Sequence, residues 1–210
     1  MSKTLIIAEI GVNHNGNIDT AKKMIEVAKK CGADIVKFQT FNTDALTSKF
    51  AKMAEYQKKN MGEEKSQKDM LKSLALSYDD FIELADYCKK VGILFLSTPF
   101  DIGSVHFLDS LQDIWKIPSG EITNYPYLVE IAKTKKKIIL STGMCTMDEV
   151  EASLKVLKDN GAADITLLHC TTDYPAPLES VNLKAMLTLK EKFGCPVGYS
   201  DHTKGIEVSV

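Results

Sequence analysis

Apolar residues recur along this chain in short runs rich in Ile, Val, Leu and Phe, and most runs are followed by a segment with apolar residues at helical spacing. The runs predict strands at 5–10, 34–38, 93–97, 114–117, 137–141, 165–169 and 196–199. The pattern therefore indicates strands and helices in alternation.

Helix starts are marked in the segments between these runs. One apolar stripe is formed by Ile18, Ala21, Met24, Ile25 and Ala28, and another begins with Leu183, Met186, Leu187 and Leu189. Ser77 with Asp80, and Thr146 with Glu149, have the spacing of capping boxes and predict helices over 81–90 and 150–158.

Alternating strands and helices predict a parallel sheet, either closed into an eight-stranded barrel or open and doubly wound. The barrel is favoured, because no G-x-G-x-x-G follows the first strand and polar residues follow nearly every strand. We expect a (β/α)8-type (TIM) barrel, truncated after about strand seven, as one domain over 1–210. A polar, lysine-rich insert is expected at about 43–72.

Charge and composition exclude some classes of function. The net charge of −2 and pI near 6.1 give no electrostatic reason to expect nucleic acid or a membrane as partner. The first residues match neither a signal peptide nor a membrane span, so a cytoplasmic protein is expected. Five widely spaced cysteines favour reduced thiols. Because the chain contains no arginine, an anionic ligand must be held by lysines, hydroxyls and backbone N–H groups.

The first two strand ends carry polar side chains that a buried strand does not explain. Glu9 ends an apolar run, where a carboxylate is costly unless it is paired, so a site role is favoured. Turn formation accounts for Asn15 and Gly16. For His14, a role in the site and a purely structural role remain open. Lys37 and Gln39 share one face of the second strand and are expected to point into the barrel mouth.

Lysine and hydroxyl groups follow the later strands. Lys116 precedes Ser119 and a Gly-Glu turn that ends in Glu121. Three further strand ends repeat the hydroxyl theme, with Thr98, Ser141 and Ser200. Converging lysines and hydroxyls with helix N-termini behind them suit a phosphate group. A phosphate-binding loop of the G-x-x-x-x-G-K-[ST] type is missing, which disfavours nucleotide triphosphate hydrolysis.

A metal site is suggested by one histidine only. His202, beside Asp201 after the last strand, is either a ligand of a divalent metal or a hydrogen-bonded loop residue. His169 is a second imidazole, but strand periodicity leaves its facing ambiguous.

Taken together, these motifs resemble those of the N-acetylneuraminate (sialic acid) synthase family, which includes legionaminic and pseudaminic acid synthases. The motifs are EIGVNHNG, VKFQTF, AEYQ, LSTPFD, KIPSGEITNYP, ILSTGM, LLHCTTDYPAP and GYSDHT, in the order of the family. The resemblance implies condensation of phosphoenolpyruvate with N-acetylmannosamine or a related N-acyl amino sugar, with release of phosphate. It also implies a divalent metal, Mn²⁺ or Mg²⁺, and a homodimer in the full-length family form.

The resemblance further assigns roles to residues of this chain. Phosphoenolpyruvate would be held by Lys37, Thr98, Lys116, Ser119, Ser141 and Ser200. The sugar would contact Gln39, Thr172 and Tyr174, with Thr172 standing where some members carry asparagine. Catalytic roles fall to Glu9, Glu121 and His202, and His202 would also ligate the metal. In the family, a second metal histidine, an acidic sugar contact and a C-terminal antifreeze-like domain lie beyond strand seven, so they are expected to be absent here.

Two alternatives remain. A synthase of 3-deoxy acids from phosphorylated sugars shares the barrel but usually needs arginines for its second phosphate, and this chain has none. The other alternative is an inactive, truncated barrel that only binds ligand. The identity of the amino sugar stays open, with legionaminic acid or another nonulosonic acid as possible products.

Overall fold

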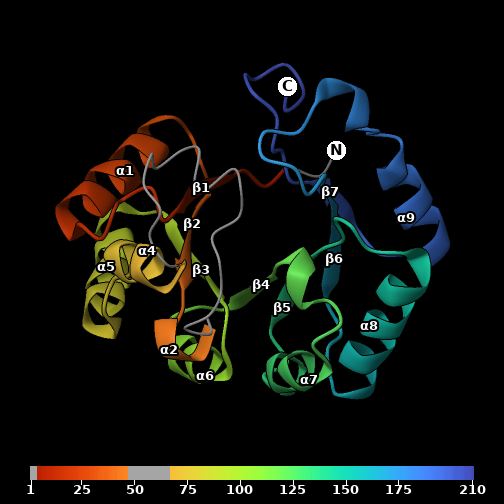
Figure 1. Cartoon of the computed structure of the whole chain (residues 1–210), viewed down its shortest axis with the longest axis horizontal. Coiled ribbons are helices and arrows are strands. Elements are labelled where there is room, and N and C mark those ends of the chain that lie inside the picture. The colour runs from red at the N-terminus through yellow and green to blue at the C-terminus, as the bar shows by residue number, and fades with distance from the viewer. Residues whose placement is uncertain (1–3, 47–66) are drawn as a thin grey trace. The chain divides into compact units, whose positions relative to one another are not determined.

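The computed structural model describes residues 4–46 and 67–210. Its described residues form two compact units, Met1–Gln112 and Asp113–Val210. Each unit has its own parallel sheet, in red to yellow-green for the first and green to blue for the second (Figure 1). The expectation of one domain over the whole chain stays a prediction.

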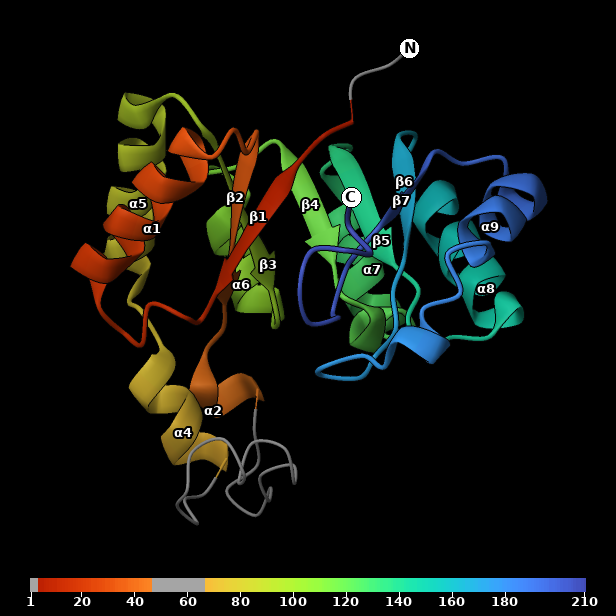
Figure 2. The same ribbon diagram turned by 90° about the horizontal axis from the view of Figure 1, so that it is seen from above.

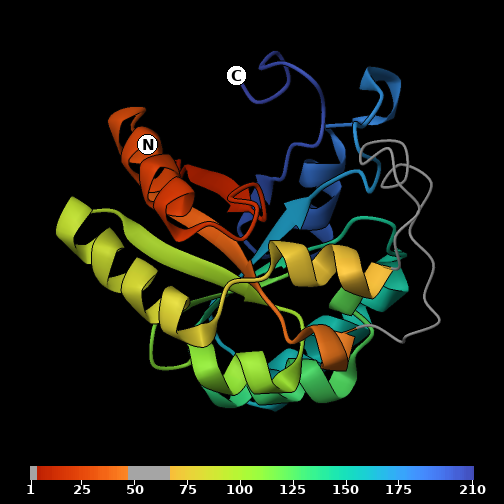
Figure 3. The same ribbon diagram turned by 60° about the vertical axis from the view of Figure 1, so that its left-hand side comes forward.

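The first unit is a three-stranded parallel sheet in the order β1-β2-β3. The strands are β1 (Ile7–Gly11), β2 (Ile35–Thr40) and β3 (Leu94–Pro99). The helices are α1 (Ile18–Lys30), α2 (Thr43–Leu46), α4 (Gln67–Leu74), α5 (Tyr78–Val91) and α6 (Ile102–Leu108). Helices α1 and α5 lie side by side along one face of this sheet (Figure 3).

The core of the first unit lies between this sheet and these two helices. Ile10, Val36 and Phe38 of the strands pack with Ile25 of α1 and Phe81 of α5. Because side chains alternate along a strand, the residues between these apolar positions point to the opposite face of the sheet. The polar positions of β1 and β2 are therefore turned away from the helices.

The second unit is a four-stranded parallel sheet in the order β4-β5-β6-β7. The strands are β4 (Ile114–Ile117), β5 (Lys137–Ser141), β6 (Ile165–His169) and β7 (Val197–Tyr199). The helices are α7 (Tyr125–Lys133), α8 (Met147–Asp159) and α9 (Ala185–Phe193), with 3₁₀ turns η1 (Ser119–Glu121) and η2 (Leu178–Ser180). Helices α8 and α9 cover β6 on one side (Figure 2). Trp115, Tyr127 and Ile131 are fully buried in its core.

The predicted strands all form, with ends that differ by at most two residues from those expected. Both capping boxes are confirmed: the side chains of Ser77 and Asp80 each accept from the other's backbone N–H, and Thr146 and Glu149 do the same. Among the described residues, four helices were not anticipated, namely α2, α4, α6 and α7. For α7 a signal existed, because Asn124 caps the helix and a proline stands in its first turn.

Two expectations need comment. The stripe expected to begin at Leu183 is wrong in part, because α9 starts at Ala185 and Leu187 is 65% exposed, while Leu189 is buried. The insert expected at 43–72 contains α2 and the start of α4. The AEYQ motif within it lies outside the described residues.

Candidate functional site

In the first unit, Glu9 and Lys37 meet at the sheet face that points away from the helices. They are direct partners in the β1–β2 register, and Lys37 Nζ forms an ion pair with Glu9 Oε2. The lysine side chain is 13% exposed and the glutamate side chain 49%. The expectation that Glu9 is a buried carboxylate is therefore wrong, because β1 is an edge strand of its sheet and leaves this side chain open to solvent.

Gly11 brings Gln39 into the same group. The β1–β2 register shifts between Glu9 and Gly11, and Gly11 has a φ of 55°, which favours glycine. A Cβ at Gly11 would lie 3.0 Å from Glu9 Oε1 and 3.6 Å from Gln39 Nε2. The carboxylate and the amide therefore converge over the Cα of this glycine.

Thr98 lies beside Gln39 in the β2–β3 register and is 2% exposed. Its Oγ1 has no hydrogen-bond partner among the described residues. The neighbouring Ser97 has a structural role instead, since its Oγ lies 2.7 Å from Thr40 Oγ1 and its N–H donates to Gln112 Oε1 at 2.7 Å. Leaving a buried hydroxyl without a hydrogen-bond partner costs about 1–3 kcal/mol. The Thr98 hydroxyl can therefore gain a hydrogen bond from a ligand or a water molecule.

In the second unit, Lys116 and Ser141 come together at adjacent strand ends. Lys116 is 6% exposed, and its Nζ donates to Ser141 Oγ at 2.7 Å and to the Ile117 carbonyl at 2.9 Å. The ammonium group is thus held by oriented oxygen atoms in a buried position. A lysine ammonium has three N–H donors, so such a group can also bind a phosphate or carboxylate oxygen.

Ser119 and Gly143 pack closely beside them. The Gly143 N–H donates to Ser119 Oγ at 2.9 Å, and Ser119 Oγ lies 3.3 Å from Cys170 Sγ. A Cβ at Gly143 would clash with Thr172 Oγ1 and would lie 2.7 Å from Cys170 Sγ. Glycine is therefore required by space at this position. Sequence reasoning did not identify Gly143 or Cys170 as supports of the site, although the STG turn and the HCTT run were both noted.

His202 is held in a defined orientation at the end of the unit. Its Nδ1 lies 2.6 Å from the Thr171 carbonyl oxygen, so Nδ1 carries the proton and Nε2 keeps its lone pair. Nε2 lies 3.4 Å from Ser200 Oγ, and the Tyr174 ring packs 4.4 Å from the imidazole. This arrangement suits a metal ligand, because ligating histidines usually donate their other N–H to a carbonyl or carboxylate.

Asp201, next to His202, and Glu121, near Ser119, each accept hydrogen bonds from neighbouring residues. Asp201 accepts from the Thr203 N–H and hydroxyl and from Ser209. Burial would raise the pKa of this carboxyl, but the hydrogen bonds outweigh it and lower the pKa. Glu121 accepts from Asn124 Nδ2 at 2.7 Å. Within residues 4–46 and 67–210, no three His, Cys, Asp or Glu side chains are grouped to hold a metal ion.

His14 belongs to the structural support of the first unit. It is 1% exposed, and its Nδ1 accepts from the Gly16 N–H at 3.1 Å. Burial lowers the pKa of this imidazole, which is therefore held neutral. The ring lies against Phe38 on the helix side of the sheet, and its Nε2 has no partner among the described residues.

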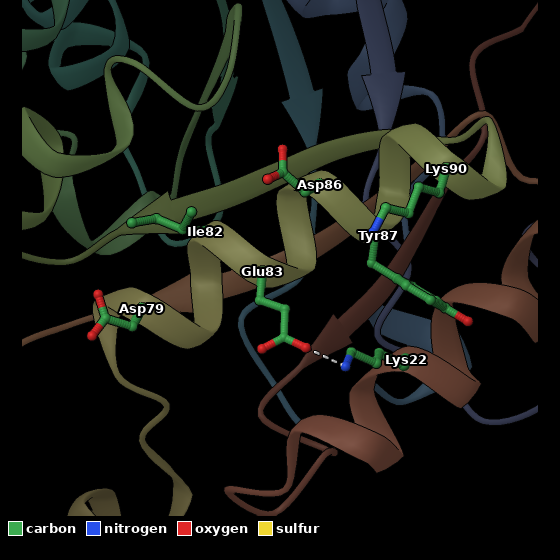
Figure 4. Close-up of a pocket in the computed structure, with 7 residues that line it drawn as sticks. All are labelled: Lys22, Asp79, Ile82, Glu83, Asp86, Tyr87 and Lys90. Atoms are coloured by element: carbon green, nitrogen blue, oxygen red, sulfur yellow. Dashed lines mark hydrogen bonds and ion pairs between the residues drawn. The ribbon is translucent and has the colours of Figure 1, made fainter.

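One hollow lies away from these strand-end groups, and a second lies beside them. A hollow of about 550 Å³ lies along the exposed side of α5 next to α1 (Figure 4). Its wall includes the ion pair of Lys22 with Glu83, and the hydrogen bond that Lys22 donates to Glu83 raises the pKa of Lys22. A second hollow of about 420 Å³ in the other unit is lined by Thr142, His169 and Cys170, among others. His169 Nε2 is already bonded to the Val181 carbonyl at 2.7 Å.

Comparison with known proteins identifies relatives that include synthases of related sugar acids. The model of the NeuB family matches residues 24–210. The chain is 56% identical to N,N'-diacetyllegionaminic acid synthase of Campylobacter jejuni, over 100% of this chain and 64% of that protein. It is 38% identical to human N-acetylneuraminate-9-phosphate synthase, over 98% of this chain and 57% of that protein. The chain thus spans about three fifths of the length of these relatives.

A crystal structure of N-acetylneuraminic acid synthetase from Leptospira borgpetersenii, in complex with citrate, matches with a TM-score of 0.86 at 34% identity. The match covers 99% of this chain and 68% of that chain. The predicted fold class, a parallel α/β fold of the (β/α)8-barrel type, is confirmed. Within the described residues, no helix is both long enough and apolar enough to cross a membrane.

Proposed function

Because the chain belongs to the NeuB family, we propose that it serves the condensation of phosphoenolpyruvate with an N-acyl amino sugar, giving a nonulosonic acid and phosphate. The observation that carries the proposal is the buried ammonium of Lys116, directed by Ser141 and a main-chain carbonyl at the strand ends. A phosphate or carboxylate oxygen of the substrate would accept a hydrogen bond from this ammonium group.

Phosphoenolpyruvate would be bound by lysines and hydroxyls. In the first unit its ligands would be Lys37 and Thr98, whose hydroxyl has no partner among the described residues. In the second unit they would be Lys116, Ser119, Ser141 and Ser200. Lysine charge offsets the phosphate and carboxylate charges, and the hydroxyls donate to their oxygens, which is the chemistry left to a chain without arginine.

The reaction forms one carbon–carbon bond and one carbon–oxygen bond to water, and it breaks the carbon–oxygen bond to phosphate. The two protons of the water end on the former aldehyde oxygen and on the phosphate. C3 of phosphoenolpyruvate attacks the aldehyde carbon of the open-chain sugar, water adds to the resulting cation at C2, and phosphate leaves with the bridging oxygen. Gln39, Thr172 and Tyr174 would contact the sugar, and Glu121 would support the reacting centre. Glu9 would orient or deprotonate the attacking water. These residues act by positioning and by charge stabilisation.

A divalent cation, Mn²⁺ or Mg²⁺, would supply polarisation of the sugar aldehyde when bound. His202 fits as one of its ligands, because the Thr171 carbonyl keeps the proton on Nδ1 and leaves the Nε2 lone pair available. The remaining ligands are not assigned to residues of this chain. Because phosphoenolpyruvate is a metabolite of the cytoplasm, we propose that the reaction takes place there. We also propose that the whole protein is a homodimer, as the family resemblance implies.

Within this reaction, identity favours one acceptor. The chain is 56% identical to the diacetyllegionaminic acid synthase of Campylobacter and 38% identical to the human N-acetylneuraminate-9-phosphate synthase. An acceptor with two N-acetyl groups is therefore favoured over N-acetylmannosamine. A phosphorylated sugar is disfavoured, because no arginine is present to bind a second phosphate.

Titration calorimetry with phosphoenolpyruvate tests the proposal. We expect Lys116→Met to weaken binding at least ~10-fold, which corresponds to ~1.4 kcal/mol. Lys133→Met on α7 is the control, because it removes the same charge from a lysine that pairs with Glu130 on the helix. Equal affinity of the two variants would contradict the assignment of Lys116.

A further inference from the structure

The protein itself supplies an anion to Lys37. Glu9 and Lys37 are paired in the β1–β2 register, and Lys37 Nζ contacts one carboxylate oxygen, Glu9 Oε2. The lysine side chain is 13% exposed, so its ammonium group is mostly removed from water. The glutamate side chain is 49% exposed, so it can turn into solvent when another anion takes its place beside Lys37. The two partners are therefore unequal: the lysine is fixed and the glutamate is displaceable.

The other oxygen of this carboxylate has a defined place too. A Cβ at Gly11 would lie 3.0 Å from Glu9 Oε1, so the absence of a side chain there leaves room for this oxygen. The same point lies 3.6 Å from Gln39 Nε2. The carboxylate of Glu9, which contacts a lysine proposed to hold phosphoenolpyruvate, and the amide of Gln39, proposed to hold the sugar, thus both lie next to Gly11.

We infer that Glu9 competes with the substrate anion for Lys37: it neutralises the lysine before binding and gives it up when a phosphate or carboxylate arrives. The inference rests on the proposed function, since it takes Lys37 as an anion ligand. It adds a role to Glu9 that is separate from work on the attacking water. The pair would make the site selective, because an anion must interact with Lys37 more strongly than Glu9 does in order to bind.

Removing the competitor should strengthen anion binding. An ion pair with one partner this exposed corresponds to a factor of about 1.4 to 5 in a binding constant. We expect Glu9→Gln to bind both phosphoenolpyruvate and inorganic phosphate tighter by this factor in titration calorimetry. A merely structural role for Glu9 would leave affinity unchanged or reduce it, so a gain in affinity is specific to competition.

A matched control is available in the same unit. Glu83 of α5 also forms an ion pair with a lysine, Lys22, but on the helix side (Figure 4). Glu83→Gln makes the same change in net charge, and we expect it to leave both affinities as in the unmodified chain. A similar gain in Glu83→Gln would show that net charge alone strengthens binding, and would overturn the inference.

Lys37→Met separates the inference from the proposed function. If Lys37→Met weakens binding while Glu9→Gln binds as the unmodified chain or more weakly, competition is refuted and the assignment of Lys37 stands. If Lys37→Met binds normally, Lys37 is not an anion ligand, and both the assignment and the inference fail. Circular dichroism verifies that each variant is folded. Should Glu9→Gln not fold, Glu9→Asp is the second variant, because its side chain is one methylene shorter and places the carboxylate farther from Lys37. We then expect a smaller gain in affinity for phosphoenolpyruvate and phosphate.

Discussion

At the scale of single residues, two glycines of the second unit differ in what surrounds them. A Cβ at Gly143 would clash with Thr172 Oγ1 and lie 2.7 Å from Cys170 Sγ and 3.1 Å from Ser119 Oγ, whereas a Cβ at Gly120 would meet nothing within 4 Å. We expect Gly143→Ala to lower the free energy of unfolding by about 1–3 kcal/mol, because the added methyl group overpacks this point. Gly120→Ala should change it by less than about 0.5 kcal/mol.

Urea unfolding of both variants makes this comparison. If the two alanine substitutions lower the free energy of unfolding equally, the close packing of Gly143 against Ser119, Cys170 and Thr172 is contradicted. Affinity for phosphoenolpyruvate is a second readout, because the displaced Ser119 hydroxyl is a proposed ligand.

His14 carries a prediction on pH. Burial lowers its pKa below 6.5 in the folded chain. As the pH falls through 6.5, the unfolded chain binds a proton at this residue that the folded chain does not bind. The free energy of unfolding should therefore fall on acidification in this range, and His14→Gln should flatten that slope. Unfolding measured from about pH 5 to about pH 8 tests this expectation.

His106→Gln is the control, because it replaces an exposed histidine and leaves His14 in place. A titration of the imidazole resonances by nuclear magnetic resonance gives the pKa of His14 directly. A value at or above 6.5 would contradict the account of a buried, neutral His14.

At the scale of elements, α5 depends on its first turn. The Ser77 hydroxyl accepts from the Asp80 N–H at 3.1 Å, and Asp80 Oδ2 accepts from the Ser77 N–H at 2.8 Å. Because α5 buries Phe81 and Leu84 in the core, the cap also positions core residues. We expect Ser77→Ala to cost about 1 kcal/mol of stability, while Ser77→Thr, which keeps the hydroxyl, costs much less. Equal stabilities of these two variants in urea unfolding would contradict the role of the capping box.

The elements also show which features the sequence could predict. The strands Ile114–Ile117, Lys137–Ser141 and Ile165–His169 have the predicted bounds, because each is an apolar run that ends at turn residues. Polar residues after these runs could be assigned to one edge of the sheet, since parallel strands end on the same side. The partner of Lys37 could not, because the sequence does not give the register in which β1 pairs with β2. The cost of burying Glu9 was misjudged for the same reason, since the sequence does not say which strand lies at an edge.

At the scale of the whole molecule, binding and turnover are expected to separate. The 210 residues correspond to 64% of the length of the Campylobacter relative. The resemblance places a second metal histidine and an acidic sugar contact in the part of the relatives that this chain does not match. We therefore expect the chain to bind phosphoenolpyruvate through its lysines and hydroxyls, yet to release phosphate only at the background rate when N-acetylmannosamine or a diacetamido acceptor and Mn²⁺ are added.

Phosphate release by the chain and by a form extended to the full length of its relatives is the measurement that tests this separation. The extended form should turn over, and faster with the diacetamido acceptor than with N-acetylmannosamine. In it, Lys116→Met should reduce kcat/KM at least ~10-fold, because the lost ammonium stabilises charge on the phosphate. Turnover by the 210-residue chain at the rate of the extended form would mean that every group needed for the chemistry lies within these residues. The remaining metal ligands would then have to be sought among the carboxylates and amides of this chain, with His202 as the starting point.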